Sequence, residues 1–132
     1  MQVKAISNYQ QEDVFAITGY PSESKLNIDK GKDDCQPIGP NPLELLLSSL
    51  SGCISVYAKK YLAKHKIEFK NLLVSSTAKL SQDSPLRLVD FNTEVETDAD
   101  LGQKRKIFLK FIQSCPIHNT ITKESNINIS LK

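Results

Sequence analysis

The sequence predicts a single α+β domain over residues 1–132, and three patterns carry that prediction. Alternating apolar residues fill the N-terminal part, a long apolar segment with helical spacing follows, and the C-terminal part mixes both patterns. With 39% hydrophobic and 24% charged residues, the composition is that of a globular protein. A chain of 132 residues suffices for one hydrophobic core, so we expect no second domain.

The N-terminal part predicts an antiparallel meander of two or three strands. Its runs "QVKAISNY", "DVFAITGY" and "SKLNID" alternate apolar and polar residues and are broken at Gly19 and Pro21. The next segment, 29–42, is rich in glycine, proline and aspartate and has no periodicity. We therefore expect a loop that leads into a helix.

We expect a helix over 42–65, because the residues at its start are typical of a helix N-terminus. Asn41 can cap it, Pro42 suits the first helical position, and Glu44 can reach back to the backbone N–H of Asn41 in a capping box. Between 43 and 58 the only polar residues besides Glu44 are four serines. The first half of the helix should therefore be covered on most sides, whereas the second half is amphipathic.

The C-terminal half predicts two strands, two helices and a last strand. The two strands alternate around a turn at Ser84–Pro85. Val89, Phe91 and Val95 are candidates for the buried face, although the register slips between them. The expected segments are strands at 69–83 and 87–98, a helix from Asp100, a short helix at 115–121 and a strand at 126–131.

The net charge and the lack of targeting signals limit the partners and the location that we expect for this protein. A net charge of +2 implies neither nucleic acid nor an acidic membrane, and the basic run at 103–106 fits a solvated helix surface. The N-terminus lacks the apolar stretch of a signal peptide, and no segment reaches about 18 apolar residues, so we expect a cytoplasmic protein without a membrane span. In that setting three cysteines favour redox or nucleophilic chemistry over a structural disulfide framework.

Cys115 stands directly before Pro116, a pair typical of a helix start with the thiol at the cap. There the free backbone N–H groups and the positive end of the helix dipole favour a thiolate, so Cys115 is expected to ionise most readily. A helix cap that happens to be cysteine is an equal alternative. His118 has CxxH spacing from Cys115, but zinc sites need three or four ligands, so an ordinary packing histidine is the favoured interpretation.

Cys53 lies three turns inside the long helix, on one face with Leu46, Leu50 and Tyr57. The helix dipole contributes little there, and burial among leucines disfavours a thiolate unless a cation or a donor comes from elsewhere. Taken alone, Cys53 fits a core cysteine that packs as a small hydrophobe. Cys35 follows two aspartates in the loop, which disfavour its thiolate, and we expect no role for it.

Two segments, "GPNPLELLLSSLSGC" at 39–53 and "CPIHNTI" at 115–121, occur together in this chain. The pair, and the order of the elements around it, resembles the OsmC/Ohr family of thiol-dependent peroxidases over nearly the whole chain. The resemblance implies an OsmC-like fold, with antiparallel sheets packed around a long central helix. It also implies an intertwined homodimer with two active sites at the subunit interface.

The same resemblance implies roles for three residues. Cys53 would be the peroxidatic cysteine, whose thiolate attacks the distal oxygen of an organic hydroperoxide, releases the alcohol and becomes a sulfenic acid. Cys115 would resolve that acid as an intramolecular disulfide, which a dithiol reductant, lipoyl-type in better-known relatives, reduces again. Glu44 occupies roughly the position of the family's catalytic glutamate. Neither a metal nor a bound cofactor is implied.

Two features depart from the family pattern. Catalytic members activate the thiolate with an arginine from the N-terminal strands, whereas this chain has only Arg87 and Arg105. The family glutamate usually stands ten residues before the cysteine, whereas Glu44 stands nine before Cys53, half a turn from the Cys53 face, so Glu44 can be a capping residue only. Candidate replacement cations are Lys4, Lys25, Lys30 and Arg87.

These departures leave two alternatives open. One is a protein of the same fold with weak or no peroxidase activity, which binds a small apolar ligand or acts in thiol transfer. The other is a structural dimer in which both cysteines are packing residues. Cysteines far apart in the fold would favour the second alternative, because a disulfide needs Cα atoms within about 7 Å.

Overall fold

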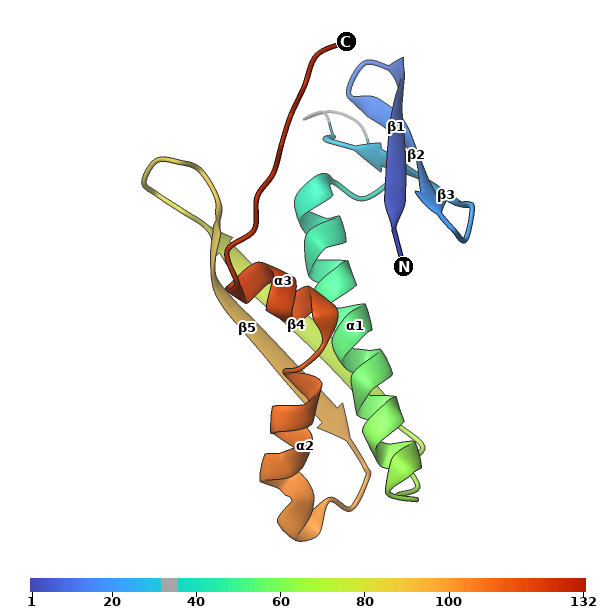
Figure 1. The fold of residues 1–132 in the computed structure, drawn as a ribbon, viewed down its shortest axis with the longest axis vertical. Coiled ribbons are helices and arrows are strands. Elements are labelled where there is room, and N and C mark those ends of the chain that lie inside the picture. Colours follow the sequence, from blue (N-terminus) through green and yellow to red (C-terminus); the bar gives the residue numbers. More distant parts are fainter. Residues whose placement is uncertain (32–35) are drawn as a thin grey trace. The chain divides into compact units, whose positions relative to one another are not determined.

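The computed structural model describes residues 1–31 and 36–132, so the prediction for Cys35 lies outside the described residues. By their contacts the residues form two compact units, Met1–Leu46 and Leu47–Lys132, which are described in turn. The helices and strands in chain order are β1 (Lys4–Gln11), β2 (Val14–Tyr20), β3 (Ser24–Asp29), α1 (Pro42–Lys64), β4 (Leu72–Leu80), β5 (Leu88–Thr97), the 3₁₀ helix η1 (Gly102–Lys104), α2 (Arg105–Ile112) and α3 (Pro116–Thr122). Figure 1 labels the strands and the α-helices.

The N-terminal unit contains an antiparallel sheet in the order β1-β2-β3, which confirms the predicted meander with three strands. The central strand β2 pairs with β1 through Ala5 opposite Gly19 and with β3 through Phe15 opposite Ile28. Val14 is buried in this sheet, and most of its other side chains are half-buried or exposed. The strands are joined by short, tight turns. Between β1 and β2, Glu12 adopts a positive φ of 47°.

Asp29, the last residue of β3, binds two described residues of the connection to α1. The Asp29 carboxylate accepts hydrogen bonds from the backbone N–H groups of Gly31 (2.7 Å) and Ile38 (3.0 Å). Gly39 packs on the backbone of Asn27 so closely that a Cβ there would collide with it. The helix start is therefore fixed to the sheet of the same unit by specific contacts.

Helix α1 begins at Pro42, as predicted, and its first turn has the expected capping box. The Glu44 backbone N–H donates to Asn41 Oδ1 (2.9 Å), and the Asn41 backbone N–H donates to Glu44 Oε2 (2.8 Å). Each side chain thus satisfies a backbone donor that a helix start leaves free. Among the described helices, none is both long and apolar enough to cross a bilayer.

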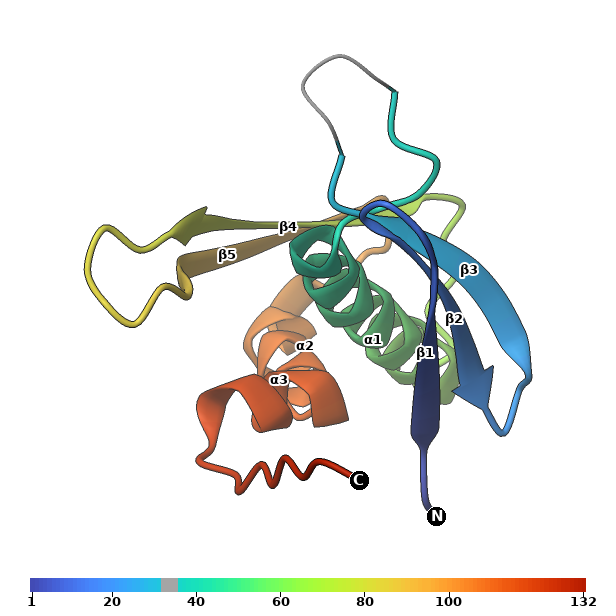
Figure 2. The same cartoon turned by 90° about the horizontal axis from the view of Figure 1, so that it is seen from above.

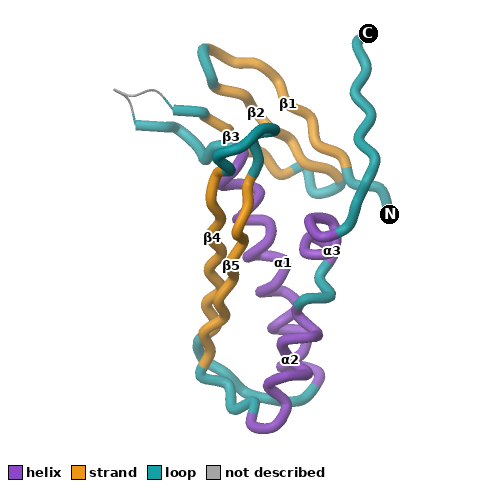
Figure 3. Tube along the Cα trace, turned by 90° about the vertical axis from the view of Figure 1, so that its left-hand side faces the viewer, coloured by secondary structure: helices purple, strands orange, loops and turns teal. Residues whose placement is uncertain are grey.

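In the C-terminal unit, β4 and β5 form an antiparallel hairpin, as predicted, with Val74 opposite Val95. The predicted register slip is present as an irregularity after Thr77, where Asp90 adopts a φ of 54°. Helices α1, α2 and α3 lie on the same face of this hairpin (Figure 2). Figure 3 shows α1 and α2 running along it.

The core of the C-terminal unit lies between α1 and α2. Residues spaced by three or four positions on α1 are buried against Phe108 and Ile112, the buried residues of α2. Tyr61 meets Phe108 edge to face, with ring centroids 5.4 Å apart. The buried cluster consists of Leu50, Ile54, Ala58, Tyr61, Leu62, Phe108, Ile112 and Cys115.

The strand predicted at 126–131 is wrong. In the described structure this tail has no helix or strand, and Ile127, Ile129 and Leu131 are 82%, 94% and 100% exposed. A strand needs a neighbouring edge for its backbone N–H and C=O groups, and no strand of either unit pairs with this segment among the described residues. The α+β class with antiparallel sheets is nevertheless confirmed by the remaining elements.

Candidate active site

Cys115 is the N-cap residue of α3, as predicted from the Cys-Pro pair. Its backbone is extended (φ −63°, ψ 143°), Pro116 takes the first helical position, and the backbone N–H of His118 donates to Cys115 Sγ at 3.3 Å. The thiol is also part of the buried core, with 0% of the residue exposed. The Cys115 sulfur therefore belongs both to the helix cap and to the buried core.

The expectation that the cap would favour a Cys115 thiolate is wrong in direction. Burial raises the pKa of the Cys115 thiol above its ordinary value and outweighs the hydrogen bond from the His118 backbone N–H, which lowers it. The nearby Cys53 thiol raises the pKa of Cys115 further, through a side-chain hydrogen bond and through charge repulsion. Local sequence shows the cap, whereas the burial depends on α1 and α2.

Cys53 is half-buried on α1 and packs against the core cluster that contains Cys115. Cys53 lies close enough to Cys115 to raise the pKa of the Cys115 thiol. On the predicted face of α1, Leu50 is buried and Tyr57 is half-buried and packs on the cluster, whereas Leu46 is 40% exposed. The fold thus brings together the two cysteines that the sequence places far apart.

Glu44 belongs to the N-terminal unit, whereas both cysteines belong to the C-terminal unit. Its carboxylate takes part in the capping box with Asn41. The candidate cations Lys4, Lys25 and Lys30 also belong to the N-terminal unit. The described structure therefore supports a capping role for Glu44 directly and leaves its catalytic role a prediction.

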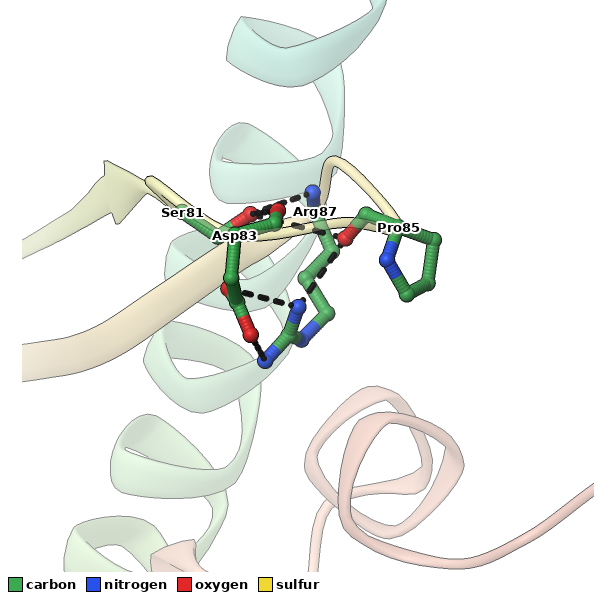
Figure 4. Close-up of polar contacts among 4 residues, drawn as sticks. All are labelled: Ser81, Asp83, Pro85 and Arg87. Carbon is green, nitrogen blue, oxygen red and sulfur yellow. Dashed lines mark hydrogen bonds and ion pairs between the residues drawn. The ribbon is translucent and has the colours of Figure 1, made fainter.

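Arg87, another candidate cation, is bound within the loop between β4 and β5 (Figure 4). Its guanidinium donates to Asp83 Oδ1 at 3.0 Å, to Asp83 Oδ2 at 3.3 Å and to the Pro85 carbonyl at 2.9 Å. Its backbone N–H donates to Ser81 Oγ at 3.1 Å. These contacts hold the hairpin loop together. Among the described residues, no cation contributes to the raised pKa of Cys115.

A cavity of about 760 Å³ lies in the C-terminal unit, within the size range of small-molecule sites. It lies between β5 and the helices. Neither cysteine lines it, but Leu50 and Ile54, which flank Cys53 on α1, and His118, which follows Cys115, all do. Its lining comprises Leu50, Ile54, Phe91, Thr93, Val95, Thr97, Ala99, Asp100, Leu101, Gly102, Arg105, Phe108, Leu109, Ile112, Gln113, His118, Ile121 and Thr122.

His118 is a residue whose position the sequence did not reveal. Its Nδ1 atom is buried and has no hydrogen-bond partner among the described residues. The CxxH spacing was the available signal: it places the His118 backbone N–H on the Cys115 sulfur, while His118 also lines the cavity. Within 1–31 and 36–132, no group of three or more His, Cys, Asp and Glu residues is placed to hold a metal ion.

Comparisons with known proteins agree with this architecture. A model of the OsmC-like protein family matches residues 31–130. The chain is similar to the solved OsmC-like protein of Mycoplasma pneumoniae, with 25% identity and a TM-score of 0.69 over 91% of this chain and 85% of that chain. It also resembles a hypothetical protein of Aquifex aeolicus, with 17% identity and a TM-score of 0.76 over 92% of this chain and 87% of that chain.

A third similar structure is the organic hydroperoxide resistance protein OhrB of Bacillus subtilis. It is 17% identical, with a TM-score of 0.66 over 92% of this chain and 91% of that chain. No curated protein matches the sequence. At these identities the likeness to the Aquifex and Bacillus proteins concerns the fold.

Proposed function

The chain belongs to the OsmC-like family, whose model matches most of its length, and we propose that it is a thiol-dependent peroxidase that reduces organic hydroperoxides to alcohols. The observation that carries this proposal is the interaction between the Cys53 and Cys115 thiols. It argues against the alternative in which both cysteines only pack. The name of the similar Bacillus protein, an organic hydroperoxide resistance protein, supports the same class of substrate.

In this proposal Cys53 reacts first. Its thiolate attacks the distal oxygen of the hydroperoxide, the O–O bond breaks, and the proximal oxygen leaves with a proton as the alcohol. The half-buried position of Cys53 against the apolar cluster shelters the resulting sulfenic acid from a second oxidation. The adjacent cavity, lined by apolar side chains such as Phe108 and Ile112 and by polar ones such as Thr93 and Arg105, offers space for the hydrocarbon part of the substrate.

Cys115 then resolves the sulfenic acid. Its sulfur bonds to Cys53 Sγ, and the sulfenic oxygen leaves as water, so that a disulfide forms. Because burial raises its pKa, Cys115 remains a neutral thiol that resists direct oxidation until the sulfenic acid appears beside it. A dithiol reductant, proposed to be of the lipoyl type, restores both thiols while it becomes a disulfide itself, and the proposed cycle uses no metal or bound cofactor.

Glu44 is proposed to act through its charge as well as through the helix cap. Glu44→Gln retains an oxygen that can accept from the Asn41 backbone N–H, so it separates these two functions. We expect Glu44→Gln to retain stability but to lower kcat/KM by about 10-fold if the carboxylate acts in the site. Unchanged kcat/KM would leave Glu44 as a cap alone.

The proposed active form is an intertwined homodimer in the cytoplasm, without nucleic-acid or membrane partners. The C-terminal tail supports the dimer, because Ile127, Ile129 and Leu131 alternate along it and are almost fully exposed. Such an alternation is typical of a strand that buries one face. A second copy can offer a sheet edge, and it can also bring the Glu44 and lysines of its own N-terminal unit to the site.

The proposal is tested by turnover of cumene hydroperoxide with dihydrolipoamide as the reductant. The wild-type protein should consume peroxide catalytically, and Cys53→Ser should abolish turnover. Cys35→Ser is the matched control, since it removes a thiol for which no role is expected, and it should retain full activity. Full activity in Cys53→Ser would refute the proposal.

A second candidate is a binding or thiol-transfer protein of the same fold with weak peroxidase activity. The cavity of about 760 Å³ and the absence of arginine from the N-terminal strands favour it. It predicts slow peroxide consumption together with a small apolar molecule that remains bound through purification, detectable by native mass spectrometry. Rapid peroxide consumption by a protein without such a ligand would exclude it.

A further inference from the structure

We propose that a basic face on the C-terminal unit docks an acidic protein that carries the dithiol reductant and presents it to Cys53. The basic face consists of Lys60 and Lys64 on α1, Lys104 at the end of η1 and Ile107 on α2. The proposal rests on the peroxidase function above and adds to it the surface on which the reductant arrives.

The packing of α1 against α2 brings the residues of the basic face to one end of the unit. Tyr57 packs on Phe111 with ring centroids 5.6 Å apart. One turn later on α1, Tyr61 packs on Phe108 with centroids 5.4 Å apart. Higher numbers on α1 thus meet lower numbers on α2, so the two helices run in opposite directions (Figure 1). Continuing by one turn on each helix leads to two lysines of the basic face.

The basic face is exposed and has no acidic partner. Its three lysines are exposed, and Ile107 is 62% exposed. Among the described residues no ion pair joins any of these lysines to a carboxylate, since the ion pairs there lie in the β4–β5 hairpin. Lys60 and Lys64 are four residues apart on one helix, where like charges repel each other. The complement of this face is a surface that carries negative charge.

Helical spacing connects the basic face to Cys53. Lys60 and Lys64 follow Cys53 by seven and eleven positions on α1, so the three residues lie on the same side of the helix. The Lys60 ammonium lies over the ring of Tyr57, which stands between them, 5.6 Å from its centroid. Two turns separate Cys53 from Lys60, about 10 Å along the helix axis. A dithiol at the end of a long side chain of the docked protein spans that distance.

Accessibility decides which sulfur the reductant attacks. Cys115 is 0% exposed, whereas Cys53 is half-buried. In the Cys53–Cys115 disulfide the reductant thiolate therefore attacks Cys53 Sγ, and the Cys115 sulfur leaves and takes up a proton. The second thiol of the reductant then attacks the reductant sulfur of this mixed disulfide, and Cys53 leaves as a thiol. Two electrons pass from the dithiol to the protein, and the reductant ends as a disulfide.

The test measures reduction of the disulfide form by two reductants. One is an acidic lipoyl domain in its dihydrolipoyl form, and the other is free dihydrolipoamide, which has no protein surface to dock. In the triple variant Lys60→Gln, Lys64→Gln, Lys104→Gln we expect the second-order rate constant with the domain to fall about 10- to 100-fold. The value with dihydrolipoamide should change less than about 3-fold. Added salt should slow the reaction of the domain and leave that of dihydrolipoamide unchanged.

The matched control is the variant Lys79→Gln, Lys123→Gln, Lys132→Gln. It removes the same charge from exposed lysines outside the basic face and should keep both rate constants. The disulfide form is prepared with cumene hydroperoxide and, separately, with diamide. Failure of the first preparation alone would refute the peroxidase function, whereas the second preparation still tests docking.

Two results would overturn the inference. One is an equal rate constant with the lipoyl domain for the wild-type protein and the basic-face variant. The other is a change from dimer to monomer in that variant, since it would assign the basic face to a second copy of the chain.

Discussion

Cys115 experiences two opposing influences on its thiol. The hydrogen bond from the His118 backbone N–H stabilises the thiolate, whereas complete burial stabilises the neutral thiol. Burial is the larger influence, so the pKa of Cys115 is raised. A resolving cysteine benefits from this balance, because the neutral thiol is the less reactive form until a sulfenic acid lies next to it.

The raised pKa of Cys115 predicts a pH dependence of stability. Since the folded state holds this proton more tightly than the unfolded state, the contribution is complete below the ordinary thiol pKa of about 8.5 and is lost as the pH rises through the raised value. Urea unfolding of the reduced protein between pH 7 and 10 should therefore show falling stability. Cys115→Ala should flatten that fall, and an identical slope in this variant would contradict the assignment.

At the scale of single residues, the sequence predicted that Cys115 caps a helix but not that the pKa of its thiol is raised. The Cys-Pro pair locates Cys115 at the helix start, because proline suits the first helical position. The direction of its pKa shift depends on burial by Leu50, Ile54 and the α2 residues, which no local pattern contains. The free Nδ1 of His118 was missed for the same reason, since the residue type does not reveal its burial.

Helix α1 has specific hydrogen bonds at both of its ends. The start is the capping box of Asn41 and Glu44. The end has the hydrogen bonds of a Schellman motif: the Ile67 N–H donates to the Leu62 carbonyl at 2.9 Å and the Lys66 N–H donates to the Ala63 carbonyl at 3.1 Å. Lys66 adopts a φ of 54° at the position where glycine is usual.

This end predicts a stabilising substitution. Lys66→Gly removes the steric cost of the left-handed conformation and should raise the free energy of unfolding by about 0.5–1 kcal/mol. Lys59→Gly is the matched control, because residue 59 is exposed and lies inside the helix, where glycine destabilises by about 1 kcal/mol. Urea denaturation measures both, and destabilisation by Lys66→Gly would contradict the assigned geometry.

The helices and strands could be predicted from the sequence wherever a local pattern of apolar and polar residues marks them. Alternation located the strands β1 to β5, because burial of one face repeats with the period of the element. The tail at 126–131 has the alternation of a strand but forms none within the described chain. Alternation reports a face suited to burial and does not identify the edge that pairs with it.

The whole molecule consists of two compact units joined through α1. The family match covers residues 31–130 and so includes parts of both units. A single domain over 1–132 stays a prediction, as does the homodimer. The proximity of Cys53 and Cys115 could be anticipated from the family resemblance only, because helical and strand periodicity do not relate segments so distant in the chain.

The tail provides the prediction at this scale. If a second copy covers Ile127 and Ile129, replacing both with Asp should convert a dimer into a monomer. Asn126→Asp combined with Asn128→Asp adds the same charge to the opposite face of the alternation and should leave the dimer intact. Light scattering after size-exclusion chromatography distinguishes the two, and a dimer that survives the isoleucine substitutions would contradict the proposed role of the tail.

The central claim is that Cys53 is oxidised by an organic hydroperoxide and rescued by Cys115. The most direct measurement treats the reduced protein with one equivalent of cumene hydroperoxide, blocks the remaining thiols and maps the peptides without reduction. We predict the loss of two thiols per chain and a peptide pair cross-linked between Cys53 and Cys115. Recovery of both cysteines as free, blocked thiols would contradict the account.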